Sequence, residues 1–357
     1  MNTRTLFTTR WARPAARGPR ATDRRRSARA SLLCGAVAFV AASAGLAVAL
    51  ETVRPEWRDP EFGHRVKRLA RVNEPVVLVV GTSRTQNAIA PAAMGGGTRA
   101  FNFGQSASTP LKHLLALRRV LDAGAPPAAV VVELFPPGLA VNGPADGEFR
   151  DRVARLSAGD FRHLAPYLTA PGDLRGDWLR ARAAPWLAQR QVLMSHWAPN
   201  WQPWDRRIDF QWDTLDPHGF QPIAGVSPEH RERAWAHARR EYRDAVIGFH
   251  PGAESSRAVR DLVAVCRERS VPVAFFVPPI SPAFRESFAP GVLGAAEAHL
   301  LKLAGELGVP VFPAPRDTTE DEFMDGHHML RHGAERYSRW VADTHLTPWL
   351  TGLGVTR

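Results

Sequence analysis

A serine, an aspartate and a histidine stand where they could form a catalytic triad. Ser83 follows the apolar run 75–80 through Gly81, so its hydroxyl would be presented at the end of a buried strand. Asp325 lies three residues before His328 in an Asp-Gly-His-His segment, so one loop could hold both a general base and the carboxylate that orients it. Ser83 would then be the nucleophile of an acyl transfer, His328 would take its proton, and Asp325 would fix the tautomer of His328.

Neither motif is specific by itself. A serine after a strand is a common helix cap, and so are Asp and His in a surface turn. The adjacent residues His327 and His328 also suggest a metal site. However, no matching pair of histidines or carboxylates occurs at ligand spacing elsewhere in the sequence. We therefore expect no metal and no cofactor. His327 is kept as the alternative base, because only geometry can decide between the two rings.

The elements around these residues alternate between apolar strands and amphipathic helices. Thr109 as N-cap and Pro110 as first residue mark the start of one helix. Apolar runs predict buried parallel strands at 75–80, 99–103, 128–134, 271–277 and 309–312, and further helices are expected at 255–269, 291–308 and 333–346. The alternation predicts an α/β fold over residues 74–350, a three-layer α/β/α sandwich with a parallel sheet, and a ligand at the carboxyl ends of the strands.

The positive charge of the chain is concentrated at its N-terminus. Residues 1–30 hold nine arginines against one acid and so carry +8 of the formal net charge of +11. The rest of the chain has an ordinary charge balance. This distribution argues against a nucleic-acid partner.

An uncharged apolar run at 31–50 is long enough to cross a bilayer as a helix. The arginines before it place the N-terminus in the cytoplasm and the chain after Glu51 outside, in the periplasm or at the cell surface. We expect a cytoplasmic leader at 1–30, a signal-anchor at 31–50 and a connector at 51–73. A cleaved signal peptide competes, because residues 47–49 fit a small-x-small cleavage site, and a twin-arginine signal is a weaker hypothesis.

Residues 140–250 interrupt the alternation with a stretch rich in Trp and Pro, which we interpret as an insertion forming a cap beside the site. Its indoles could stack on sugar rings, or they could pack the insertion against the core or the membrane surface. They are Trp178, Trp186, Trp197, Trp201, Trp204, Trp212 and Trp235.

The order of the motifs resembles the signature blocks of the SGNH (GDSL-like) hydrolase superfamily. The blocks are Gly81-Thr82-Ser83, Asn102-Phe103-Gly104 and Asp325-x-x-His328. The resemblance covers about residues 75–140 and 255–345. It implies an SGNH or flavodoxin-like fold, with Ser83 as nucleophile and Asp325 and His328 completing the triad. It also implies an oxyanion hole formed by the backbone N–H groups of Ser83 and Gly104.

Two departures from the family pattern stand out. Thr82 replaces the aspartate of the first block and leaves the nucleophile in place. Where the third block would supply an asparagine donor, the chain has Glu133, whose carboxylate accepts hydrogen bonds and repels an oxyanion unless its pKa is raised. Losing one such donor typically costs about 10²–10³ in rate. Arg84, Asn102 and Gln105 are the candidate substitutes.

A similar loosening of the third block occurs in membrane-tethered cell-envelope relatives such as the alginate O-acetyltransferase group. We therefore expect an extracytoplasmic serine esterase or O-acyltransferase acting on acyl esters, with envelope polysaccharide as one candidate substrate. The alternative is a catalytically impaired, membrane-anchored protein that binds a glycan or an envelope-assembly partner protein. Glu133 favours this alternative, and the complete set of Ser83, Asp325 and His328 opposes it.

Overall fold

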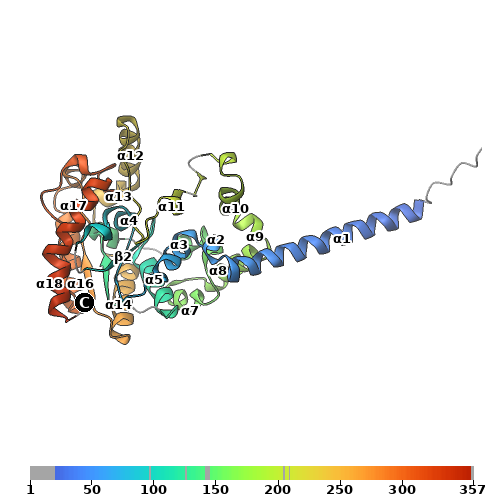
Figure 1. The fold of residues 1–357 in the computed structure, drawn as a ribbon, viewed down its shortest axis with the longest axis horizontal. Helices are drawn as coiled ribbons and strands as arrows, with labels where there is room; N and C mark the ends of the chain where they lie inside the picture. The colour runs from blue at the N-terminus through green and yellow to red at the C-terminus, as the bar shows by residue number, and fades with distance from the viewer. Residues whose placement is uncertain are drawn as a thin grey trace, which may run out of the picture.

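A long helix, α1 (Ala21–Val48), projects from an α/β domain (Figure 1). The computed structural model describes residues 21–95, 98–124, 127–140, 145–203, 206–208 and 210–354. Residues 1–20 of the expected leader therefore lie outside the described residues. α1 runs on into a π-helical turn, Ala49–Val53. Within this stretch, Arg25–Val53 is long and apolar enough to cross a membrane.

Five parallel strands form one sheet in the order β2-β1-β3-β4-β5. They are β1 (Val77–Gly81), β2 (Ala100–Gly104), β3 (Ala129–Glu133), β4 (Val273–Phe276) and β5 (Val311–Phe312). Each begins one or two residues after its predicted start, so the predicted α/β class and parallel sheet are confirmed. The strand order reverses between β1 and β3, and the carboxyl ends at such a point are where open α/β sheets bind ligands.

Successive side chains of the strands enter two different apolar cores. Leu78 and Val80 of β1 join one core, whereas Val77 and Val79 join the other. Because both faces of the sheet are covered, the strands are apolar along their whole length. The first core is completed by α5 (Pro110–Asp122), α14 (Ala253–Glu268) and α16 (Val292–Leu307), and the second by α4 (Ser83–Ala88) and α17 (Arg331–Val341).

The helix starts follow the predicted signals, but the last helix differs. The Thr109 hydroxyl accepts a hydrogen bond from Lys112 N, and Pro110 is the first residue of α5. The single helix predicted at 333–346 is instead α17 followed by a π-helical turn, Ala342–Leu346, and α18 (Thr347–Gly352). Pro348, near the start of α18, has no N–H to continue the preceding ladder, which accounts for the irregular turn.

The expected connector folds onto the domain rather than forming a free spacer. It contains α2 (Pro55–Arg58) and α3 (Pro60–Leu69). Phe62 of α3 packs edge-on against Phe103 of β2, with ring centroids 5.4 Å apart. Leu69 belongs to the same core. Packed side chains of the connector therefore link the base of α1 to the sheet.

The insertion divides into two parts. Its first half includes α8, α9 and α10 beside the base of α1, whereas α12 and α13 lie near α4 (Figure 1). Only the second half could therefore cover the carboxyl ends of β1 and β3. The helices of the insertion are α6 (Ala145–Arg150), α7 (Asp160–Leu164), α8 (Pro171–Ala183), α9 (Pro185–Ala188), α10 (Arg190–Trp197), α11 (Phe210–Asp213), α12 (Pro228–Glu241) and α13 (Arg243–Ile247).

Candidate active site

Ser83, His328 and Asp325 form a continuous hydrogen-bonded chain. His328 Nε2 lies 2.7 Å from Ser83 Oγ. The other ring nitrogen, Nδ1, lies 2.7 Å from Asp325 Oδ2. Both distances suit hydrogen bonds in which the serine is activated through one nitrogen and the carboxylate orients the ring through the other. The three residues chosen from sequence are thus brought together in the geometry that a triad requires.

The turn between β1 and α4 presents the serine. Thr82 adopts an extended conformation as N-cap of α4, and its hydroxyl accepts a hydrogen bond from Arg84 N at 3.1 Å. Ser83 is the first residue of α4, so its own N–H has no intrahelical acceptor. Among the described residues no other acceptor is bonded to it. This N–H is free to donate to an oxyanion.

The loop that carries Asp325 and His328 is held closed at its base. Phe323 and Met329 form an antiparallel bridge. Within the loop, Met324 N donates to His328 O at 2.9 Å, and His328 N donates to Asp325 Oδ1 at 2.9 Å. The carboxylate therefore orients the backbone of the loop as well as the imidazole ring.

Gly326 is required at the tip of this loop. Its φ of +89° lies in the left-handed region, and a Cβ there would lie 2.8 Å from Phe284 Cβ and 2.9 Å from the Trp235 ring. Its carbonyl accepts a hydrogen bond from Ser281 N at 2.8 Å. α15 (Pro282–Glu286) follows Ser281 directly and so supports the loop from behind.

The surroundings of Asp325 keep it ionised. Burial alone would raise the pKa of its carboxyl, but the neighbouring His328, His327 and the backbone N–H donors outweigh burial and hold the pKa well below its ordinary value. A carboxylate is the form that can orient a histidine and stabilise its protonated state.

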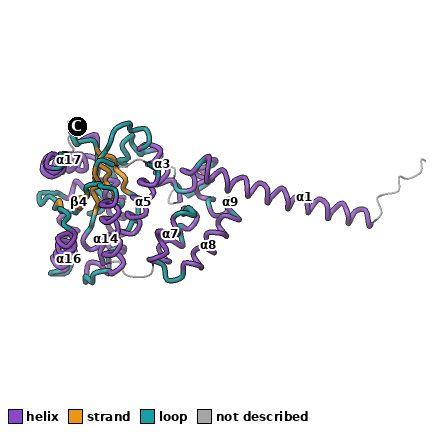
Figure 2. Tube along the Cα trace, turned by 90° about the horizontal axis from the view of Figure 1, so that it is seen from below, coloured by secondary structure: helices purple, strands orange, loops and turns teal. Residues whose placement is uncertain are grey.

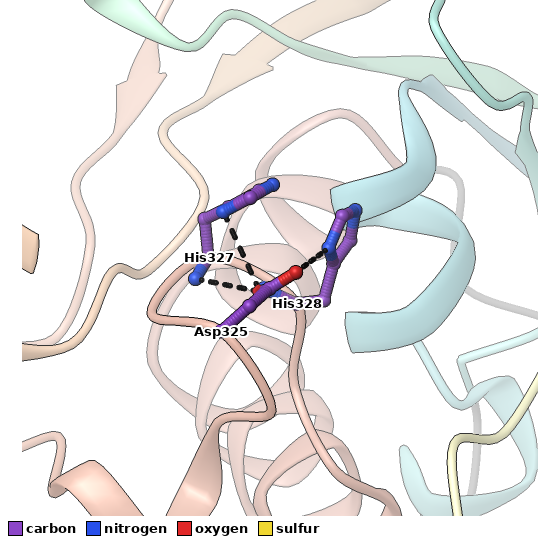
Figure 3. A group of neighbouring side chains, drawn as sticks. All are labelled: Asp325, His327 and His328. Atoms are coloured by element: carbon purple, nitrogen blue, oxygen red, sulfur yellow. Dashed lines mark hydrogen bonds and ion pairs between the residues drawn. The ribbon is translucent and has the colours of Figure 1, made fainter. Parts of the chain in front are cut away.

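The two adjacent histidines have different positions (Figure 3). His327 is 2 % exposed, and its Nδ1 lies 3.4 Å from Asp325 Oδ1, whereas His328 faces the serine. Burial is the largest cause that lowers the pKa of His327 well below its ordinary value, and the nearby His328 lowers it further. The geometry therefore places His328, and not His327, against the serine, with His327 a buried ring behind it.

The same three side chains contain a set of metal-ligand atoms. One ligand atom from each of Asp325, His327 and His328 lies within 4.8 Å of the others. A metal bound through Asp325 and His328 Nδ1 would have to replace the hydrogen bond that orients the base. Metal binding and orientation of His328 by Asp325 would use the same atoms, so removal of metal distinguishes the two experimentally.

Glu133 holds the turn that carries Ser83. Its carboxylate accepts hydrogen bonds from Thr82 N at 2.8 Å, from Thr85 N at 3.0 Å and from Arg84 Nε at 3.0 Å. The Arg84 guanidinium also lies 4.1 Å from the centroid of the Phe135 ring. Both charged side chains are buried. Glu133 thus fixes the backbone on both sides of Ser83.

The charge state of Glu133 excludes the asparagine-like role. Burial alone would raise the pKa of its carboxyl, but Arg84 and the hydrogen bonds from Thr85 and Thr82 hold the pKa below its ordinary value. An ionised carboxylate has no proton to donate to an oxyanion. Glu133 is a positioning residue for the nucleophile turn.

The second predicted block, Asn102-Phe103-Gly104, contacts α4 rather than the cavity. Gly104 N donates to Asn102 Oδ1 at 2.9 Å, so this amide is not free for an oxyanion. A Cβ on Gly104 would lie 2.3 Å from Gln86 N, which explains the glycine. The Asn102 amide group donates to Thr85 O at 2.8 Å and to Ile89 O at 2.6 Å. The geometry therefore does not support Gly104 or Asn102 as oxyanion donors.

A cavity of about 920 Å³ opens at the triad. Arg84 borders it, but its Nε and Nη1 are bonded to Glu133 and to the Tyr242 hydroxyl. Gln105 instead borders a separate hollow beside Arg119. Of the three candidate substitutes for the missing asparagine, only Arg84 reaches the cavity.

Six of the seven tryptophans of the insertion are described, and none of these six borders the cavity. Trp204 lies outside the described residues. Trp178 Nε1 donates to Leu156 O at 2.9 Å, and Trp212 stacks on His196 at 4.6 Å. The described indoles therefore support the packing interpretation rather than sugar stacking beside the serine.

Several cavity residues carried no recognisable motif. The space in front of Ser83 is bordered by Tyr242, which lies between α12 and α13, by the loop 106–109 after β2, and by residues 221–226 of the insertion. Of these, only the loop 106–109 could have been predicted from sequence, because it directly follows a predicted strand and ligands bind at the carboxyl ends of such strands. The others depend on how the insertion folds back.

The comparisons with known proteins assign no family to the chain. No family model matches the sequence, and a search of curated proteins finds no match. The functional conclusion therefore depends on the geometry of the site.

Proposed function

We propose that this protein is a serine esterase or O-acyltransferase of the SGNH (GDSL-like) type. The hydrogen-bonded chain from Ser83 through His328 to Asp325 carries the proposal. Ser83 Oγ attacks the ester carbonyl while His328 takes its proton. His328 then returns the proton to the departing alcohol, leaving an acyl-enzyme that water or an acceptor hydroxyl cleaves.

The Ser83 N–H supports stabilisation of the developing oxyanion. A second donor is available in the loop 106–109, where Ser106 and Ala107 border the cavity and no described residue accepts from their N–H groups. Ala107 has a φ of +48°, a strained conformation for a residue with a side chain. Such outliers cluster at active sites, which favours this loop over Gly104.

The walls of the cavity favour an ester with an apolar acyl group. The side chains of Phe135, Leu139, Ile223 and Val226 border it, and no described tryptophan does. Burying each methylene of an acyl chain against such walls contributes about 0.8 kcal/mol. An apolar acyl ester therefore fits this surface better than an unsubstituted sugar does, although a sugar hydroxyl remains a candidate acceptor.

We further infer a three-layer α/β/α sandwich and a single-pass anchor. Two apolar cores on opposite faces of the sheet support the former. For the latter, α1 has the length and apolar character of a membrane span. The arginines at 24–26 then place the N-terminus in the cytoplasm and the catalytic domain outside.

Labelling with a fluorophosphonate probe tests the enzymatic proposal. The detergent-solubilised full chain should be labelled, and Ser83→Ala and His328→Ala should not. Ser287→Ala, which changes an exposed serine outside the cavity, should remain labelled. Esters of increasing acyl length should be hydrolysed with a preference for chains longer than acetyl. Absence of both serine-dependent labelling and ester cleavage would refute the proposal.

A second candidate function is binding without turnover. Its support is that Glu133 replaces the third-block asparagine and that the Gly104 amide is already bonded. On this alternative the chain binds an acylated glycan or an envelope partner protein, and Ser83→Ala leaves that binding unchanged. Binding of acylated polysaccharide with no release of acyl groups would favour it.

A further inference from the structure

Large apolar side chains are exposed on the part of the insertion that lies beside α1. Leu179 of α8 is 56 % exposed, and Trp186 and Leu187 of α9 are 44 % and 50 % exposed. Trp197 and Trp201, which follow, are 67 % and 81 % exposed. A contiguous group of this kind marks an interaction surface, and tryptophan is enriched where proteins meet the lipid–water interface.

This surface is continuous with the candidate membrane span. The Trp186 ring meets the Phe39 ring of α1 edge-on at 5.8 Å, and α8 and α9 both contact α1. Figures 1 and 2 both place α8 and α9 at the end of α1 nearest the domain. Ser43 of α1 and Leu50 of the π-helical turn that continues it are buried, so protein already covers one side of this end of the helix.

The depth of this contact indicates what covers the exposed side chains. The apolar run begins at residue 31 and ends at Leu50, and at about 1.5 Å per residue it spans about 30 Å, the thickness of a hydrocarbon core. Phe39 precedes Leu50 by 11 residues, which is about 16 Å along the helix. A segment packed against Phe39 therefore lies below the outer surface of any bilayer that α1 crosses.

Arginines around α9 limit how deep the segment sits. Arg190 is exposed, and its Nη1 donates to Leu187 O at 2.9 Å, while the Arg180 side chain at the end of α8 is 75 % exposed. Charged side chains at the centre of a bilayer are costly, but long arginines can extend to the phosphates. α9 thus combines Trp and Leu with flanking Arg residues. This composition is typical of segments that lie between lipid headgroups and acyl chains.

We propose that α9 and the end of α8 are embedded in the outer leaflet against α1, with Trp186 and Leu187 among the acyl chains and Arg180 and Arg190 at the phosphates. The occupant of the exposed apolar surface is the lipid bilayer. Together with α1 this makes a second attachment point, so the domain cannot rotate freely and its cavity keeps a fixed orientation to the membrane. The inference requires α1 to cross the bilayer, as proposed above, and is independent of catalysis.

Depth-dependent fluorescence quenching tests the proposal on the full chain. In a Cys34→Ala background, single cysteines replace Leu187, Val40 or Leu301 and carry an environment-sensitive fluorophore. Cys266 is buried and can remain. Val40 on α1 and Leu301 on α16 are 64 % and 59 % exposed and serve as lipid and water controls. The protein is reconstituted in phosphatidylcholine–phosphatidylglycerol vesicles containing lipids spin-labelled near the headgroup or deep in the chain.

We expect the probe at position 187 to be quenched several-fold more by lipid-borne labels than the probe at 301. If position 40 is quenched but 187 behaves like 301, α9 is in water or awaits a protein partner, and the proposal fails while the anchor stands. If position 40 is not quenched either, α1 does not cross the bilayer and the inference loses its basis.

Discussion

Ser83 Oγ and His328 Nε2 lie 2.7 Å apart although 245 positions separate them in the sequence. Ser83 is placed by the end of β1, and His328 by the loop immediately before α17. α17 packs against α4 in the second core, so the two ends of the chain meet at one edge of the sheet. Any change that shifts α4 against α17 should therefore alter the distance between Ser83 Oγ and His328 Nε2.

Asp325→Asn should lower kcat/KM for ester hydrolysis by about 10³–10⁴, because an amide in place of the carboxylate favours the wrong tautomer of His328. The fold should survive, since the amide has nearly the same shape. Asp321→Asn changes an exposed aspartate of the same segment, with a side chain 78 % exposed, and is the matched control. Steady-state kinetics with circular dichroism makes the comparison, and equal activity of the two variants would exclude the triad.

Glu133→Gln should destabilise the protein by about 3–5 kcal/mol, because it leaves the buried Arg84 guanidinium without its partner. It should also reduce fluorophosphonate labelling, since the backbone around Ser83 loses its acceptor. Adding Arg84→Met should recover part of the stability without recovering the labelling. Additive losses in the double variant, measured by thermal unfolding, would mean that the two side chains do not form a coupled pair.

The Glu133 contribution should depend on pH in one direction. The folded pKa lies below the ordinary value of about 4.3, so the contribution is fully present above that pH and is lost as pH falls through the folded pKa. The difference in melting temperature between wild type and Glu133→Gln should be constant from about pH 8 to pH 5 and should narrow below about pH 4. A difference that grows on acidification would contradict an ionised Glu133.

His327→Phe should retain serine labelling, because His327 packs among the aromatic rings of Tyr242 and Phe284 and does not contact the serine. Dialysis against a chelator should likewise leave ester hydrolysis unchanged. A metal bound by Asp325, His327 and His328 predicts the opposite in both experiments. Loss of activity with EDTA and its recovery with added divalent cation would replace the triad mechanism with a metal-dependent one.

Gly104→Ala should lower the melting temperature by several degrees and abolish labelling, because the added Cβ would lie 2.3 Å from Gln86 N at α4. Gly294→Ala on α16 has nothing within 4 Å of its added Cβ, and it should be neutral or stabilising because alanine favours helix. Labelling retained by Gly104→Ala would show that the close approach of β2 to α4 is not needed to position Ser83.

Local sequence features predicted most of the sheet and the nucleophile turn. The apolar runs located all five strands, because a strand buried on both faces must be apolar throughout. Thr109 and Pro110 fixed the start of α5 through local capping. Ser83, Asp325 and His328 were also recognisable, because a turn after a strand and an Asp-x-x-His spacing are local patterns.

The partners of the other candidate side chains depend on contacts between segments that are distant in sequence. Glu133 at the end of β3 pairs with Arg84 of α4. Asn102 bonds both Gly104 and α4, so the expected oxyanion amide is already occupied. Trp186 meets Phe39 of α1, and other indoles pack with neighbouring rings, because the insertion folds to two sides of the domain. These indoles are Trp178, Trp212 and Trp235. Length and apolar composition identified the candidate membrane span, and local sequence marked the serine turn. The contact of Ser83 with His328 rather than His327 depends on segments far apart in sequence.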